Sequence, residues 1–333
     1  MLCLIPSVGM IAAGPSKAAG NEILSPVPRL EKLDGTFNPE VLSEASSWFD
    51  DRFALRQQLS TAWSRINALL FGCSVNDDVI LGQEGWLFFA DSLNDYTGQL
   101  LPDEVIESAA LHLAELRDCC HENGAEFVFT VAPNKNSLYP EYMPKRIPAG
   151  KNSNVDRLYR RLSELGVDYA DLHEAFRGKD EVLYFHTDSH WNSKGAAVAA
   201  DNILSAVGVN CGFSLGEFGN GKTHTGDLFE MLYPSGKSRE TDPEYLPGFS
   251  FRSVSDPQNG NAIEFSTENP SGSGHLLCWR DSFGISLYPY LAEHFASADF
   301  SRSSDYDPER IRSGEYDTVV LEIVERNISW LAQ

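Results

Sequence analysis

The chain is poor in basic residues. Of its 333 residues, 26 are Lys or Arg and 48 are Asp or Glu, which gives a formal net charge of −22. Nucleic-acid binding needs clustered Lys and Arg against the phosphates, and the sequence has no such cluster. The acidic excess also argues against adhesion of the body of the protein to an anionic membrane. We therefore expect no nucleic-acid partner, whereas a neutral ligand such as a sugar is compatible with this charge.

The sequence also lacks an apolar run of the ~20 residues that span a bilayer. Residues 1–13 are mostly apolar and small residues follow them, although the basic n-region of a signal peptide is missing. We interpret residues 1–24 as a leader or the remnant of a signal peptide or membrane anchor. The alternative is the frayed N-terminus of a cytosolic protein.

Cysteine is scarce and is not arranged for metal binding. The six cysteines include no CxxC pair, so a structural zinc site of that type is not predicted. A chain of this length is not held together by so few disulfides. Cys119 and Cys120 lie in a helical pattern, where we expect small core residues.

The N-terminal third predicts helices around one short hairpin. Apolar residues recur at three- and four-residue steps from residue 39 to 72, which indicates one amphipathic helix or a broken pair. Two apolar runs, 79–82 and 86–89, flank Gly85 and predict a tight β-hairpin. Residues 102–123 predict a further helix, with acidic residues in its first turn.

From residue 127 onward, predicted strands and helices alternate. Strands are expected at 127–131, 167–170, 275–279 and 318–324, with a short one at 182–185, and helices at 155–165, 193–207 and 287–295. This alternation predicts an α/β fold with a mostly parallel central sheet and helices on both faces. We expect one domain over residues 25–333, with 213–273 as a loop and hairpin insertion.

Two polar segments follow predicted strands, at the edge where parallel sheets bind ligands. One is residues 186–192 and the other is residues 280–284. A serine hydroxyl becomes a nucleophile when a histidine takes its proton, and a carboxylate then orients that histidine. Ser282, His190 and Asp188 are the required residue types. Ser282 at a strand-to-helix turn would also present its own N–H to an oxyanion.

The same residues have other interpretations. A serine at such a turn is commonly a helix N-cap, and Asp281 is an alternative cap. His186, Asp188 and His190 also have the chemistry of metal ligands, although no second His/Cys pair lies nearby in sequence. From residue types alone, these alternatives stay open.

Five ordered motifs carry a resemblance to a known family. They are GWLF (85–88), VAPNK (131–135) with YP (139–140), TDSHWNSKG (187–195), DSF (281–283) and EIVER (322–326). With these motifs the chain resembles the SGNH-hydrolase-like acyltransferases of the alginate O-acetylation type and the related DHHW proteins of bacterial cell envelopes. The similarity covers about residues 25–330.

The resemblance implies a three-layer SGNH-hydrolase-like fold and a triad of Ser282, His190 and Asp188, with no cofactor and no metal. It also implies an extracytoplasmic protein, in the periplasm or at the cell surface, with an N-terminal membrane anchor in many members. The implied partners are a polysaccharide acceptor and a membrane-bound O-acyltransferase that supplies the acyl group.

We therefore expect O-acyl transfer, most simply of acetyl, through an acyl-serine. Arg280, Asn134 and Lys135 are candidates for the second oxyanion donor, and Trp191 and Tyr139 for contacts to a sugar. One alternative is an esterase or deacetylase of the same fold, in which water replaces the sugar hydroxyl. Another is a non-catalytic glycan-binding scaffold that uses aromatic platforms, namely Trp86, Trp191, Trp279 and Tyr139.

Overall fold

The computed structural model describes residue 10 and residues 24–254 and 260–332. The leader predicted for residues 1–24 therefore lies almost entirely outside the described residues. Within the described ranges, no helix combines the length and the apolar character that crossing a bilayer requires.

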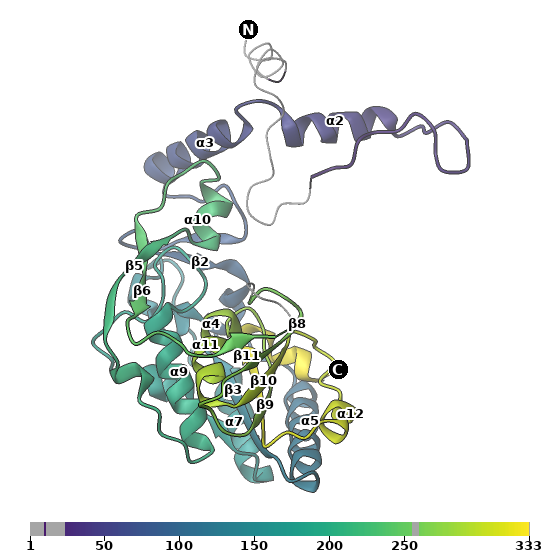
Figure 1. Cartoon of the computed structure of the whole chain (residues 1–333). Coiled ribbons are helices and arrows are strands. Elements are labelled where there is room, and N and C mark those ends of the chain that lie inside the picture. The colour runs from purple at the N-terminus through teal and green to yellow at the C-terminus, as the bar shows by residue number, and fades with distance from the viewer. Residues whose placement is uncertain (1–9, 11–23, 255–259, 333) are drawn as a thin grey trace.

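A seven-stranded sheet forms the centre of the protein, with strand order β4-β3-β11-β9-β10-β8-β7 (Figure 1). The first five strands are mutually parallel; at the edge, β8 is antiparallel to β10 and β7 is antiparallel to β8. The bounds are β3 Glu126–Ala132, β4 Tyr169–Ala170, β7 Arg252–Ser253, β8 Glu264–Glu268, β9 His275–Trp279, β10 Ser297–Ser301 and β11 Thr318–Val324. This confirms the predicted α/β fold with a mostly parallel sheet.

Helices cover both faces of the sheet because the central strands are apolar on both faces. Val128 and Val320 face one core with α9 and α11, whereas Phe129 and Leu321 face a second core with α5 and α7. Successive residues of a strand point to opposite faces, so one continuous apolar run serves both cores. The helices are α4 Leu93–Tyr96, α5 Asp103–Glu122, α6 Lys135–Leu138, α7 Asn154–Leu165, α8 Leu172–Phe176, α9 Ser193–Ala206, α11 Gly284–His294 and α12 Pro308–Ser313.

The N-terminal helical segment is a broken pair. Helix α2 (Val41–Arg52) and helix α3 (Arg56–Phe71) are separated by a short break in which Leu55 takes a left-handed φ of 67°. Both helices lie at one end of the molecule, away from the sheet (Figure 1). The hairpin β1 (Val79–Leu81) and β2 (Leu87–Phe89) follows as predicted.

The segment 213–273 is more ordered than its composition suggests. Strands β5 (Phe218–His224) and β6 (Glu240–Tyr245) form an antiparallel hairpin, with helix α10 (Asp227–Leu232) between them. Strands β7 and β8 form the predicted second hairpin and extend the central sheet.

Two sequence-based strand assignments were wrong. The strand predicted at 182–185 is an isolated bridge between Tyr184 and Trp191, because the chain turns back immediately to start α9. Strand β10 was not predicted because its Ser-Ala-Asp-Phe-Ser sequence lacks the continuous apolar run by which the neighbouring strands were recognised.

Candidate active site

Ser282 lies in the turn that joins β9 to α11, as the sequence predicted. The Asp281 carboxylate holds this turn, since Oδ1 accepts the Phe283 amide at 2.8 Å and Oδ2 accepts the Val324 amide at 2.8 Å. Trp191 Nε1 donates to the Phe283 carbonyl from the other side, at 3.1 Å. The position of Ser282 is thus determined by β11 and by the residue that follows His190.

The three residue types expected for acyl transfer meet in one chain of hydrogen bonds. His190 Nε2 lies 2.8 Å from Ser282 Oγ, and His190 Nδ1 lies 2.7 Å from Asp188 Oδ1. The 187–191 loop bends so that the Asp188 carboxylate also accepts the His190 backbone N–H at 2.9 Å. That bend is what allows a carboxylate two residues earlier to reach the imidazole.

The electrostatics suit a histidine that gains and loses a proton. Burial favours the neutral ring, but the hydrogen bond and charge of Asp188 outweigh it and raise the pKa of His190 above its usual value. Burial also opposes the charge of Asp188, yet hydrogen bonds from His190 and His224 hold the pKa of Asp188 well below its ordinary range. Asp188 therefore stays ionised and stabilises an imidazolium.

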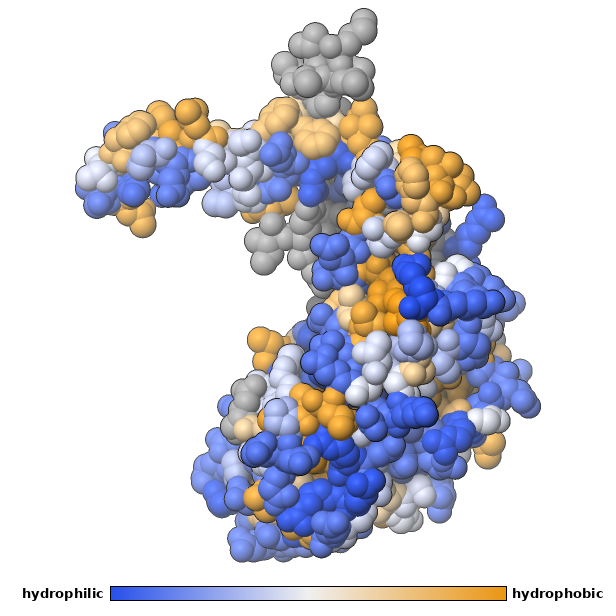
Figure 2. Space-filling view, turned by 180° about the vertical axis from the view of Figure 1, so that it is seen from behind, coloured by the Kyte–Doolittle hydropathy of each residue, from blue (hydrophilic) through white to orange (hydrophobic). Residues whose placement is uncertain are grey.

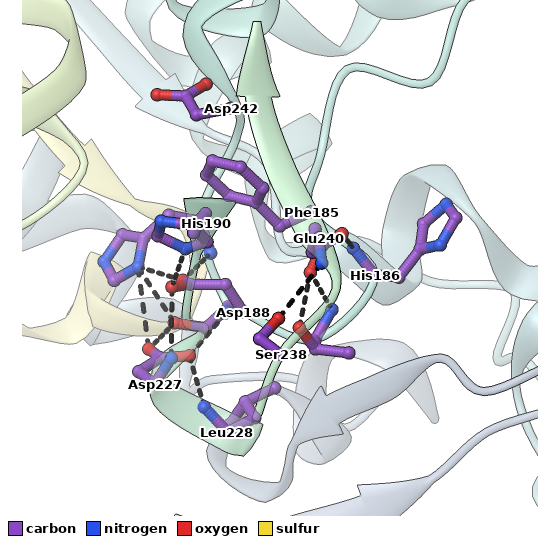
Figure 3. A network of polar contacts seen from close by, with 12 residues as sticks. Phe185, His186, Asp188, His190, Asp227, Leu228, Ser238, Glu240 and Asp242 are labelled. Atoms are coloured by element: carbon purple, nitrogen blue, oxygen red, sulfur yellow. Dashed lines mark hydrogen bonds and ion pairs between the residues drawn. The ribbon is translucent and has the colours of Figure 1, made fainter. Parts of the chain in front are cut away.

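Two further residues of this network were missed from the sequence. His224 Nε2 lies 2.8 Å from Asp188 Oδ2, and Asp227 Oδ2 lies 3.6 Å from His190 Nδ1 (Figure 3). Burial and the charge of Asp188 raise the pKa of Asp227. Both residues come from segment 213–273, which was interpreted as an insertion. Within that segment, only their residue types, His and Asp, indicate a role in the site.

The β5–β6 hairpin holds the loop that carries His190. Glu240 of β6 accepts hydrogen bonds from the His186 amide and from the Thr187 amide and hydroxyl. Asp242, two residues later, accepts the Ser193 amide at 2.9 Å and its hydroxyl at 2.8 Å. Two carboxylates of one strand thus bind both ends of the loop.

Lys135, a predicted candidate for the oxyanion donor, lies beneath this loop and binds its carbonyls. Its ammonium donates to the carbonyls of Phe185, His186 and Asp188 at 3.0, 3.0 and 2.5 Å. The side chain is buried, which lowers the pKa of Lys135 to about 7. All three donors of the ammonium are engaged.

Arg280 and Asn134 are likewise engaged elsewhere. The buried Arg280 guanidinium donates to the carbonyls of Gly260 and Ala262, at 2.6 and 3.2 Å, and so binds a surface loop. Asn134 Nδ2 donates to Asp95 Oδ2 at 3.4 Å. The expectation that one of these side chains points at the oxyanion is therefore not supported by their contacts.

The predicted aromatic platforms are mostly buried. Trp86, Trp191 and Trp279 are each at most 2% exposed, so their faces cannot stack on a sugar. Tyr139 is partly exposed, but its hydroxyl accepts the Leu183 amide at 2.9 Å and its ring packs on Trp86. These rings support the loops around the site, and the scaffold alternative loses its main support.

Arg326 is a cation at the site that the sequence analysis noted only as part of a motif. Its guanidinium lies 5.2 Å from the Phe89 ring centroid and 5.8 Å from that of Phe283, which adjoins Ser282. Asn134 Oδ1 accepts from Nη1 at 3.3 Å. Its position after β11 was the available indication, because β11 neighbours β9 in the sheet.

A metal ion is the chemical alternative at this network. Asp188, His190 and Asp227 have potential ligand atoms within 4.8 Å of one another. His186, the third ligand of the sequence-based alternative, turns away from this group (Figure 3). Its ring packs against Trp86, with the ring centroids 4.4 Å apart. Both ring nitrogens of His190 already face hydrogen-bond partners, so a metal would have to separate His190 Nδ1 from Asp188 Oδ1, which lie 2.7 Å apart, or displace Ser282 from Nε2.

The parallel sheet, its two helical layers and the serine turn at a strand end define an SGNH-hydrolase-like α/β protein. A family model described as SGNH hydrolase-like domain, acetyltransferase AlgX, matches residues 79–263. The chain belongs to this family, which confirms the resemblance found in the sequence.

Relatives and solved structures agree with this assignment. A Pseudomonas putida protein named "Probable alginate O-acetylase AlgJ" is 24% identical over 205 residues, which cover 59% of this chain and 52% of the relative. The chain thus spans about half the length of this relative. The solved structure of PatB1 from Bacillus cereus has a TM-score of 0.60 at 17% identity, covering 75% of this chain and 95% of that one. A DHHW family protein from Eubacterium siraeum has a TM-score of 0.56 at 16% identity, with coverages of 75% and 95%.

Proposed function

We propose that this protein is an O-acyltransferase that moves an acetyl group onto a polysaccharide hydroxyl through an acyl-serine at Ser282. The observation that carries the proposal is the chain of hydrogen bonds from Ser282 through His190 to Asp188. The family membership and the name of the AlgJ relative support acetyl as the group and a polysaccharide as the acceptor.

The reaction has two matched halves. His190 Nε2 takes the Ser282 proton as Oγ attacks the carbonyl carbon of a donor ester, and the imidazolium then protonates the departing donor alcohol. In the second half, His190 deprotonates a sugar hydroxyl that attacks the acyl-serine, and Ser282 recovers its proton. Each half passes through a tetrahedral oxyanion.

We assign the oxyanion to the Ser282 amide and the Arg326 guanidinium. The contact of Arg326 with Phe283 supports this, because it brings a cation to the residue next to the nucleophile. A donor aimed at the developing charge contributes about 3 kcal/mol to the transition state. Arg326→Met should therefore lower kcat by about 100-fold, whereas Arg326→Lys should retain part of the rate.

The proposed acyltransferase function also suggests where the protein acts and what supplies its acyl group. We propose an extracytoplasmic location and a membrane-bound O-acyltransferase as the source of the acyl group. Residues 25–333 are proposed to form a single catalytic domain. His224 and Asp227 support this, because segment 213–273 then contributes contacts to Asp188 and His190.

The test is acetyl transfer with and without an acceptor. The purified chain is incubated with p-nitrophenyl acetate, with and without neutral or acidic oligosaccharides. The products are identified by mass spectrometry. Acetylated oligosaccharide supports the transferase, and free acetate alone supports the esterase alternative. Ser282→Ala should lose about 10⁴-fold in rate. Ser163→Ala on α7 is the matched control, and equal loss in both variants would contradict the proposal.

A further inference from the structure

Helix α3 has its polar face toward the protein and its apolar face toward solvent. Thr61 and Ser64 are its buried residues, and Thr61 Oγ1 accepts the Ser235 amide at 3.0 Å. On the opposite side, apolar residues follow one another at steps of four, three and four and are about half exposed or more. They are Leu59, Trp63, Ile66 and Leu70. An apolar stripe of this kind normally faces a core.

The carboxyl end of α3 is apolar over more than one face. Leu69, Leu70 and Phe71 are 84%, 67% and 67% exposed. Successive helical residues point about 100° apart, so these three side chains span about 200° around the helix axis, more than one face. A partner helix would cover one face only, whereas the interfacial region of a bilayer can surround all three.

The charge around this surface differs from that of the rest of the chain. Residues 56–71 contain Arg56 and Arg65 and no acidic residue, although the protein carries −22 overall. The exposed Lys145 and Arg146 line a hollow of about 570 Å³ that Ala68 of α3 also lines. Figure 2 shows apolar side chains gathered over α3 and the adjoining hollow, at the upper right of the view.

We propose that α3 is a membrane-contacting element that lies on a bilayer surface containing anionic lipid. The apolar stripe and tip enter the headgroup region, and the exposed Lys145 and Arg146 at the adjoining hollow meet lipid phosphates. Because α2 and α3 lie at one end of the molecule, the acidic body stays away from the surface (Figure 1). Repulsion of that body falls off over a Debye length of about 8 Å at physiological salt.

The test is co-sedimentation of the full chain with sucrose-loaded vesicles of phosphatidylcholine, with and without phosphatidylglycerol. We expect binding that is stronger with phosphatidylglycerol. The double variant Trp63→Ser/Leu70→Ser should bind the vesicles at least about tenfold more weakly than the unaltered chain. Lys145→Gln/Arg146→Gln should lose the preference for phosphatidylglycerol. Leu111→Ser and Leu215→Ser remove exposed apolar residues of the body and should bind as the unaltered chain does.

Three results would overturn the proposal. In the first, the full chain remains in the lipid-free fraction. In the second, the α3 variants bind vesicles as well as the unaltered chain does, and this result would assign binding to another segment such as residues 1–13. In the third, the chain would self-associate in solution and the α3 variants would abolish this, which would make α3 an interface between two copies. Thermal unfolding of each variant verifies its fold, since the substituted side chains are exposed.

Discussion

Asp188 accepts hydrogen bonds from two imidazoles, one on each carboxylate oxygen. His190 binds Oδ1 and His224 binds Oδ2. This arrangement raises the pKa of both rings, although burial alone would lower each, and it makes their titrations interdependent. The acid–base behaviour of the site therefore belongs to the three residues together.

The pH dependence of kcat/KM should follow from the raised pKa of His190. The general base must be neutral, so the rate is lost as pH falls through a midpoint above the ordinary histidine value of about 6.5. Asp188→Asn removes the charge that raises this pKa. We expect the midpoint to move to lower pH and the plateau rate to fall about 10⁴-fold. An unchanged midpoint in this variant would contradict the role of Asp188.

His224→Gln tests whether His224 alters the pKa of His190 or only supports the loop that carries it. Glutamine still donates to Asp188 but cannot become charged, whereas a protonated His224 opposes protonation of His190. Asp188, Glu240 and Asp242 are the charged groups that act on His224. We expect the kcat/KM midpoint to rise in this variant while the rate at high pH is largely kept. A uniform loss of rate at every pH would show that His224 only supports the loop.

Lys135→Met tests the ammonium beneath the loop. It removes the ammonium from three carbonyls: the His186 carbonyl keeps the Leu87 amide as a donor, whereas those of Phe185 and Asp188 lose their ammonium partner next to a buried methyl group. We expect a loss of about 3 kcal/mol or more in the free energy of unfolding by urea, with a parallel loss of rate. Lys194→Met is the control, because its surface ion pair with Glu181 contributes at most about 1 kcal/mol. Equal effects of both variants would contradict this account.

At the scale of elements, the β5–β6 hairpin and α10 shape the site from outside the parallel sheet. Glu240 and Asp242 bind the two ends of the His190 loop, and His224 and Asp227 bind its centre. This region was predicted as loops with a hairpin because Gly, Ser, Pro and Asn are frequent there, and β5 and β6 were not predicted. Its strands depend on hydrogen bonds to residues 186–193, and local pattern does not report such contacts.

Gly226 tests how closely α10 must approach the loop. A Cβ at this position would lie 2.2 Å from the Thr187 carbonyl oxygen and 2.8 Å from the Asp188 amide nitrogen. The φ of −68° suits alanine, so a substitution acts through this contact and not through backbone strain. We expect Gly226→Ala to shift Asp188 and to lower kcat by at least about tenfold. Unchanged kcat would show that α10 can move away without cost.

At the scale of the whole molecule, the parts predicted best from the sequence were those with a strong local pattern. The apolar runs of β3 and β11 and the Ala-rich α9 were recognised, and with them the parallel sheet. The residue types at the two strand-end segments were recognised as well. What remained open was proximity, because Ser282 and His190 are 92 residues apart and meet through the order of the strands.

The same limit applies to the three side chains predicted as oxyanion donors. Lys135, Arg280 and Asn134 follow strands, as functional residues do, but each is engaged by backbone or side-chain atoms that come from distant segments. A polar residue at a strand end is equally suited to bracing a loop and to binding a substrate. Only the set of contacts distinguishes the two.

The most direct test of the central claim is to locate the adduct formed with a serine-directed sulfonyl fluoride, by intact mass and peptide mapping. The account predicts one adduct per chain, on Ser282, with a labelling rate that falls sharply in His190→Gln. A chain that stays unlabelled, or that is labelled at another serine, would contradict the claim that His190 activates Ser282.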